Sequence, residues 1–257
     1  MATIHVFRHA EALHNILPEF RAKRDPEISD AGRQQCIKMA SEFPFMDQVT
    51  HLISSPLSRA LSTIRLAFAP VAEKQQIIVF PELTEAGIAI SSFGSSIEEL
   101  QEKYGDQLDL SHVPDDWEQI HPRSRFAYDL KLIFTRAALV RERIIDLAST
   151  AEEGSHIVVM THGQTAHFMT GDFSGPEAPT YLTNWNGNLQ YRSYAIDLAS
   201  RALVETPESR VRRGILGPND PDAVAMVKAH ICQRILCRMP EVHALYEAYN
   251  KPQGEGL

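Results

Sequence analysis

The sequence predicts an α/β fold, a three-layer α/β/α sandwich with helices on both faces of a mostly parallel central sheet. Short apolar segments alternate with longer helical ones along the chain, and this order builds parallel sheets. The segment 156–160 contains I-V-V-M, which is typical of a strand buried on both faces. With 257 residues, 44% of them hydrophobic, the chain can form one large domain with a buried core.

The N-terminal third of the chain alternates strands with helices. A first strand is expected at 4–7, and Ser29 is a typical N-cap for a helix at 30–43. A second strand at 51–54 turns at Ser55-Pro56 into a helix at 57–68. β-branched and aromatic residues then indicate a third strand at 77–80.

The regular pattern breaks between residues 81 and 125. Glycine and proline recur along this segment, and the sequence favours only one short helix in it, at 96–104. The segment is too long for an ordinary connection. We therefore predict that it is a lid inserted into a single domain that spans 1–257.

The C-terminal half contains the clearest helix of the chain. Apolar residues recur at helical spacing over 126–149, and Gly154 precedes the strand at 156–160. The remaining pattern indicates a β-pair at 189–198 and 202–205, followed by helices at 222–238 and 241–249.

Composition excludes several classes of function. The net charge of −8 argues against a nucleic-acid partner and against an anionic membrane surface. No apolar run reaches the ~18 residues of a transmembrane helix, and the N-terminal segment carries charges where a signal peptide is apolar. Cys36, Cys232 and Cys237 are too few and too irregular for a disulfide framework or a zinc site. We expect reduced thiols in a cytoplasmic protein.

Polar side chains suited to phosphate chemistry follow the predicted parallel strands. In chain order they are Arg8 and His9, Arg59, Glu82 and Glu85, and His162. The carboxyl ends of parallel strands meet at one edge of a sheet, so these side chains are expected to converge. Arginine binds phosphate in a bidentate manner, histidine can attack phosphorus, and a helix N-terminus near Arg59 adds N–H donors. The sequence therefore predicts a site for a phosphate dianion that uses no metal.

The segments that carry these residues resemble the motifs of the histidine phosphatase superfamily, which contains cofactor-dependent phosphoglycerate mutase. The matching motifs are R-H-G-(E/Q), L-(S/T)-x-x-G-x-x-Q, S-(D/S/P)-x-x-R-(A/C)-x-(Q/S)-T, L-x-E and (T/S)-H-G. They correspond in order to 8–11, 28–35, 54–63, 83–85 and 161–163. Each motif is weak alone, but the ordered set is specific and covers the chain from Ile4 to Gly163.

The resemblance implies a phosphoglycerate mutase-like fold and a role for each residue. His9 would be the nucleophile, Glu85 the proton donor with Glu82 as the alternative, and His162 a catalytic and phosphate-binding residue. Arg8, Arg59 and Asn15 would bind phosphate. Arg24 and Gly163 are further candidates for contact with the substrate.

Two features depart from the general family pattern. Ala10 replaces the motif glycine, and alanine is tolerated there if the backbone φ is negative. The R-H-A sequence with His14-Asn15, together with Trp185-Asn186-Gly187-Asn188, resembles a fungal branch of the family.

The resemblance implies hydrolysis of a small-molecule phosphomonoester, without metal or cofactor, by a monomer or homodimer. One alternative is a mutase, but 86–93 is neutral and apolar where glycolytic mutases carry N-E-R-x-Y-G. Another is a catalytically silent or repurposed member that binds a phosphorylated metabolite. The lid is acidic and contains Phe93, Tyr104 and Trp117, which favours a monophosphate with a bulky or apolar body.

Overall fold

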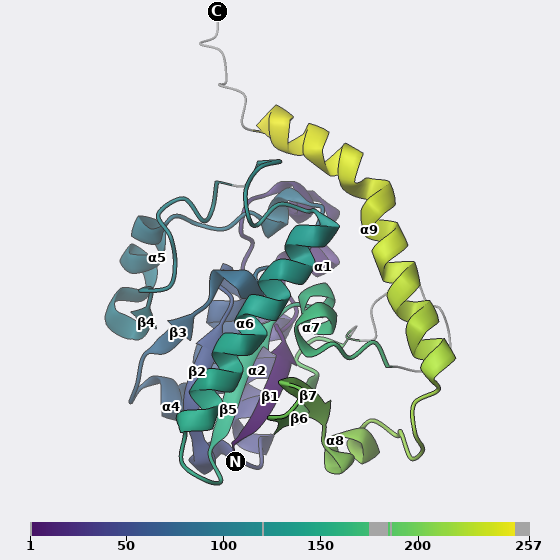
Figure 1. Cartoon of the computed structure of the whole chain (residues 1–257). Coiled ribbons are helices and arrows are strands. Elements are labelled where there is room, and N and C mark those ends of the chain that lie inside the picture. Colours follow the sequence, from purple (N-terminus) through teal and green to yellow (C-terminus); the bar gives the residue numbers. More distant parts are fainter. Residues whose placement is uncertain (1, 120, 175–184, 186, 250–257) are drawn as a thin grey trace, which may run out of the picture.

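The computed structural model describes residues 2–119, 121–174, 185 and 187–249. Within them, a seven-stranded sheet has the order β4-β3-β2-β5-β1-β6-β7, with helices on both faces (Figure 1). The strands are β1 (Thr3–Arg8), β2 (Val49–Ser54), β3 (Ile77–Val79), β4 (Leu108–Asp109), β5 (His156–Thr161), β6 (Tyr191–Asp197) and β7 (Ala202–Glu205). Pairs among β1 to β5 are parallel, whereas β6 pairs with β1 and β7 in antiparallel fashion. The predicted mostly parallel sheet is confirmed.

The helices connect these strands and cover the sheet. The α-helices are α1 (Leu13–Ile16), α2 (Asp30–Glu42), α3 (Ser58–Ala67), α4 (Ala69–Ala72), α5 (Ile97–Tyr104), α6 (Leu130–Thr150), α7 (Gly163–Thr170), α8 (Pro207–Arg212) and α9 (Pro221–Tyr249). Short 3₁₀-helices are η1 (Pro18–Ala22), η2 (Met46–Gln48), η3 (Pro81–Leu83), η4 (Ile90–Ser92) and η5 (Gly105–Gln107).

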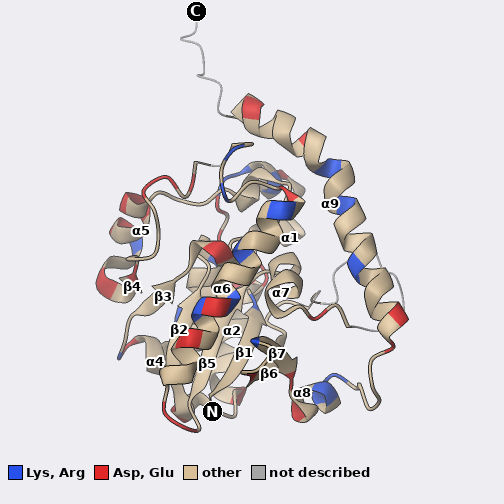
Figure 2. Cartoon of the chain, in the orientation of Figure 1, with Lys and Arg blue, Asp and Glu red and all other residues tan. Residues whose placement is uncertain are grey.

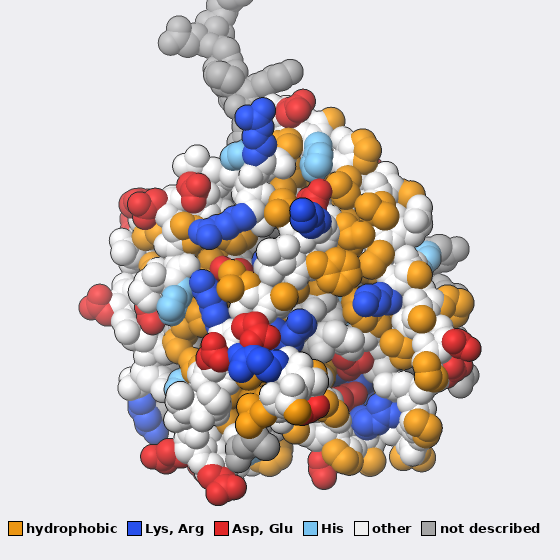
Figure 3. All heavy atoms as spheres, viewed as in Figure 1, with side chains coloured by type: hydrophobic (Ala, Val, Ile, Leu, Met, Phe, Trp, Pro, Cys, Tyr) orange, Lys and Arg blue, Asp and Glu red, His pale blue; other side chains and the backbone are white. Residues whose placement is uncertain are grey.

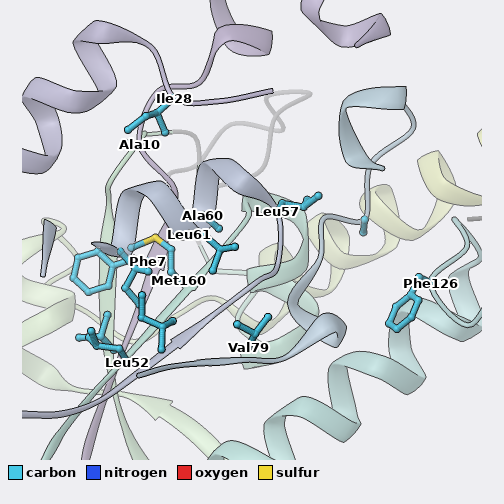
Figure 4. Close-up of a cluster of buried hydrophobic side chains, with 14 of the residues drawn as sticks. Phe7, Ala10, Ile28, Leu52, Leu57, Ala60, Leu61, Val79, Phe126 and Met160 are labelled. Atoms are coloured by element: carbon cyan, nitrogen blue, oxygen red, sulfur yellow. The ribbon is translucent and has the colours of Figure 1, made fainter. Parts of the chain in front are cut away.

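Alternate residues of the central strands face two separate hydrophobic cores. Phe7 of β1 and Leu52 of β2 pack beneath α3, as Figure 4 shows. Ile4 and Val6 of β1 belong to the other core, together with apolar residues of α6 and α7. This alternation follows from the two-residue period of a strand, and it explains why both faces are covered by helices.

Several elements escaped the sequence analysis, among them β4, α7 and α8. β4 is only two residues long and extends the sheet at one edge. α7 is buried along nearly its whole length, so it lacks the polar face on which an amphipathic pattern depends. α8 has only six residues and starts at Pro207, after the N-cap Thr206. Short or fully buried elements carry little periodic signal.

Two predicted helix boundaries were wrong. The helix expected from residue 126 begins at Leu130, because the side chain of Asp129 accepts a hydrogen bond from the Leu132 N–H and caps it. The two C-terminal helices form the single helix α9, which contains Pro240. Buried Ile235 and Val242 on either side of the proline hold α9 against the core, and this packing offsets the lost backbone hydrogen bond.

The segment 81–125 contains η3, η4, α5, η5 and β4, and thus contributes an edge strand to the sheet. Its aromatic side chains Phe93, Tyr104 and Trp117 are buried in the same core as Phe7. Its function as a lid on a single domain stays a prediction.

The molecular surface mixes charged and apolar groups. Acidic side chains gather at α5 and Lys and Arg lie along α9 (Figure 2), while hydrophobic side chains are scattered among polar ones on the face in Figure 3. Across the described ranges, no helix combines the length and the hydrophobicity needed to cross a bilayer.

Candidate active site

The carboxyl ends of β1, β2 and β5 lie next to one another and carry the predicted site. Arg8 is the last residue of β1 and pairs in register with Thr161 at the end of β5, so His9 and His162 are neighbours. Their ring centroids are 5.1 Å apart. Arg59 lies in the first turn of α3, which follows β2. The charges of Arg8 and Arg59 lower the pKa of both imidazoles, so the two arginines lie in the same region as His9 and His162.

The imidazole of His9 is held in one orientation. Its Nδ1 lies 2.6 Å from the carbonyl oxygen of Ala10, and a carbonyl can only accept, so Nδ1 carries the proton. The other ring nitrogen, Nε2, then keeps its lone pair. Burial, followed by the charges of Arg59 and Arg8, lowers the pKa of His9 well below its usual value. At neutral pH His9 is therefore an uncharged imidazole that can act as a nucleophile.

Ala10 fits its position without strain. Among the described residues, the non-glycine residues with positive φ are Asp25, Leu189 and Arg201, so Ala10 has a negative φ. Its methyl group is fully buried in the core near Ile28 (Figure 4), and its N–H donates to Thr63 Oγ1 at 3.0 Å. Alanine thus supplies the backbone carbonyl that orients His9 as glycine would.

Two arginines bring positive charge to the site. Arg59 is 1% exposed, and its Nη1 donates to the carbonyl of Ser91 at 2.8 Å. Burial lowers the pKa of Arg59 to about 10, so the side chain is still charged at neutral pH. Partly buried Arg8 donates from Nη1 to the carbonyl of Trp185 at 3.0 Å. The Nε of Arg59 has no hydrogen-bond partner among the described residues and can donate to an anion.

His162 is the N-cap residue of α7 and is fully buried. Its Nε2 lies 2.9 Å from Ser55 Oγ, whereas its Nδ1 has no partner in the described part of the chain. Burial and then the charge of Arg59 lower the pKa of His162 well below its usual value. A buried ring nitrogen beside His9 is available for a ligand oxygen.

The two candidate acids have different surroundings. The carboxylate of Glu82 is 3% exposed and forms an ion pair with Arg143 of α6 at 3.2 Å. Glu85 is half-buried, and its Oε1 accepts from the Ala86 N–H at 2.9 Å and from the Thr165 N–H at 3.3 Å. The charge of Glu85 also acts on Arg8 and Arg59. The geometry favours Glu85 as the candidate proton donor, because the carboxylate of Glu82 is paired with Arg143 of α6.

The remaining candidates differ in their relation to this site. Gly163 follows His162 directly, as the first residue of α7. Asn15 Oδ1 accepts from the Ala12 N–H at 2.9 Å, so this side chain caps α1. Arg24 contacts the segment 81–125 instead of the phosphate site, because its Nε donates to the carbonyl of Gly94 at 2.5 Å.

Two residues near His9 were not predicted as site residues. The ring of His14 lies 5.7 Å from that of His9, and burial followed by Arg59 and Arg8 lowers the pKa of His14 to about 3. Asn188 donates from Nδ2 to the carbonyl of His9 at 3.2 Å. Asn186, two residues before Asn188, lies outside the described residues. Both His14 and Asn188 stand in segments that the sequence analysis noted only for the resemblance to a fungal branch, and that branch stays a prediction.

Comparison with known proteins identifies the family of this chain. The model of the histidine phosphatase superfamily (branch 1) matches residues 4–204. Phosphoglycerate mutase-like protein 4 from Arabidopsis thaliana is 26% identical over 168 residues, which cover 63% of this chain and 66% of that protein. The chain thus spans about two thirds of the length of this curated relative.

One of the similar solved structures shows the same fold. The ecdysone phosphate phosphatase from Bombix mori in complex with tungstate has a TM-score of 0.55 at 14% identity, covering 80% of this chain and 93% of that one. A phosphoglycerate mutase from Bacillus anthracis str. Sterne has a TM-score of 0.49 at 16% identity, covering 88% and 96%. The family model covers most of the sequence, including every residue placed in the site above, and the chain belongs to the histidine phosphatase superfamily.

Proposed function

We propose that the protein is a phosphatase that hydrolyses a small-molecule phosphomonoester through a phosphohistidine on His9. The observation that carries this proposal is the 2.6 Å hydrogen bond between His9 Nδ1 and the carbonyl of Ala10. This bond leaves Nε2 unprotonated, in a site where Arg59 and His162 can hold phosphate oxygens.

In the first half-reaction, His9 Nε2 attacks phosphorus in line with the ester oxygen. The P–N bond forms as the P–O bond to the leaving group breaks. Arg8, Arg59 and His162 stabilise the charge on the equatorial oxygens. Glu85, protonated at this stage, donates its proton to the leaving alkoxide.

In the second half-reaction, the carboxylate of Glu85 removes a proton from water, and the water oxygen attacks phosphorus. The P–N bond breaks, phosphate leaves and His9 returns to its neutral form. The guanidinium groups of Arg8 and Arg59 provide the positive charge, so the proposal includes no metal and no cofactor.

Hydrolysis is preferred over mutase chemistry because of the segment 86–93, which carries no charged side chain. Part of it forms η4, whose Ser91 carbonyl accepts from Arg59. The segment 86–93 thus lies beside Arg59 and suits a monophosphate with an uncharged or apolar body. It offers no basic side chain that could bind a second acidic group of the substrate. No observation favours a silent or repurposed member, since Ala10 leaves the orientation of His9 intact.

The proposal is tested by measuring phosphate release from a broad panel of monophosphates, with and without EDTA and vanadate. We expect release that resists EDTA, is inhibited by vanadate and falls at least ~10³-fold in His9→Ala. Circular dichroism of the variant controls for folding. Full activity of His9→Ala would overturn the assignment of the nucleophile, and transfer of phosphate to a second hydroxyl in place of free phosphate would establish a mutase.

A further inference from the structure

We propose that Asp25 is a positioning residue that fastens the segment 91–96 to the first turn of α3, and thereby sets how closely the substrate is enclosed beside Arg59. The inference rests on the proposed phosphatase function, because it concerns the same site. Asp25 lies in the loop between η1 and α2 and belongs to none of the catalytic motifs.

The carboxylate of Asp25 joins two segments that are distant in the sequence. Its Oδ1 accepts from the Ser58 N–H at 2.8 Å, and its Oδ2 accepts from Ser58 Oγ at 2.9 Å. The same Oδ2 accepts from Ser95 Oγ at 2.7 Å. Ser58 immediately precedes Arg59, so a single side chain connects the arginine-bearing turn to the predicted lid.

Neighbouring contacts fasten the same segment from both sides. Arg24 donates from Nε to the carbonyl of Gly94 and forms an ion pair with Glu99 of α5 at 3.3 Å. Arg59 itself donates to the carbonyl of Ser91. Asp25 therefore acts at the centre of a contact region in which 91–96 closes over the N-terminus of α3.

The backbone of Asp25 has a conformation that suits aspartate better than most other residues. Its φ of 45° lies in the left-handed region, which L-residues other than glycine, asparagine and aspartate seldom occupy. Burial raises the pKa of its carboxyl group, while the hydrogen bonds from Ser95 and Ser58 and the charge of Arg59 oppose that change. Here the N-cap residue of α3, Leu57, offers no side-chain acceptor, and Asp25 supplies one.

Charge and geometry can be separated at this position. In Asp25→Asn the amide oxygen can still accept from the Ser58 N–H, and the NH₂ group can donate to the serine hydroxyl oxygens. Asp25→Ala removes every bond, and Ser95→Ala removes only the bond to the lid. Ser41→Ala is the matched control, because the Ser41 hydroxyl is exposed and, among the described residues, bonds only to the Lys38 carbonyl within α2.

The first measurement is hydrogen–deuterium exchange of peptides from 88–104 in the free protein, which needs no turnover. We expect exchange to be ~5-fold faster in Ser95→Ala and faster still in Asp25→Ala, as for the loss of one or several hydrogen bonds. Asp25→Asn and Ser41→Ala should resemble the wild type. Unchanged exchange in Ser95→Ala would overturn the proposal, and this variant decides the test because Asp25→Ala also uncaps α3.

The second measurement is steady-state hydrolysis of p-nitrophenyl phosphate. We expect Ser95→Ala to raise KM ~3- to 5-fold with kcat within ~2-fold, because only enclosure of the substrate is lost. Faster exchange with an unchanged KM would overturn the role in enclosing substrate. If the wild type releases no phosphate, KM cannot be measured. The dissociation constant of vanadate is then measured for the wild type and for each variant instead. A change in exchange and vanadate affinity then supports the positioning role even as the proposed phosphatase activity fails.

Discussion

Replacing Glu85 with glutamine is expected to slow phosphate release from alkyl monophosphates by ~10²- to 10⁴-fold, the usual contribution of a positioned general acid. Glutamine keeps the size of the side chain and an oxygen that can accept from the Ala86 N–H, which lies 2.9 Å away. The loss therefore reports the missing carboxyl group, which donates a proton in the first half-reaction and accepts one in the second. Stability should change little, because the side chain is half-buried and no ion pair of the described residues contains Glu85.

Glu82→Gln is the matched variant with the opposite expectation. The carboxylate attracts Arg143 across 3.2 Å, which corresponds to about 5 kcal/mol at an effective dielectric constant of ~20. Desolvation of the buried carboxylate offsets much of that attraction, and Arg143, at 34% exposure, can be rehydrated once its partner is neutral. We therefore expect the free energy of unfolding to fall by about 1–2 kcal/mol, with kcat within ~2-fold of the wild type.

The assay compares kcat/KM for an alkyl monophosphate with kcat/KM for p-nitrophenyl phosphate, because this ratio reports the steps up to phosphorylation of His9, and measures urea unfolding of each variant. Nitrophenolate leaves without protonation, so Glu85→Gln should lose much less activity on that ester at the phosphorylation step. Equal losses of kcat/KM on both esters would refute the role of Glu85 as general acid. Loss of activity in Glu82→Gln with activity retained in Glu85→Gln would show that the wrong carboxylate was chosen.

Three further predictions concern stability. Ala10→Gly should lower the free energy of unfolding, measured by urea unfolding, by about 1–2 kcal/mol, because a buried methyl group is lost and the unfolded chain becomes more flexible. Its kcat should stay within ~3-fold of that of the wild type. Gly32→Ala should lower the free energy of unfolding by more than about 2 kcal/mol and lower Tm. The reason is that a Cβ at Gly32 would lie 2.1 Å from the backbone oxygen of Glu11. A Tm like that of the wild type would contradict this prediction. Burial lowers the pKa of His5 to about 3 and that of His167 to about 4, so the stability present above the unfolded pKa of 6.5 is lost as pH falls. Between pH 7 and pH 5, each of these two histidines should lower the free energy of unfolding by about 2 kcal/mol. Equal urea midpoints at the two pH values would contradict this prediction.

The sequence by itself determined the alternation of strands and helices, and it named the residues that we propose for the phosphate site. Apolar periodicity is a local signal, and so is the spacing of the motifs around Arg8, His9, Arg59 and His162. Each of these residues follows a strand or opens a helix that the pattern marks clearly. The parallel arrangement of the strands then implied that their ends converge, as the structure shows.

Only the tertiary structure decided the features that depend on contacts between distant segments. The choice between Glu82 and Glu85 depends on α6 and α7, because Arg143 pairs with one carboxylate and Thr165 contacts the other. The continuity of α9 through Pro240 depends on how the helix packs against the core. The fit of Ala10 depends on its backbone φ, which motif spacing does not encode. Asp25 meets Ser95 across a separation of 70 residues. Local propensity carries no information about such pairs, because burial and hydrogen bonding at one residue depend on side chains that are distant in the sequence.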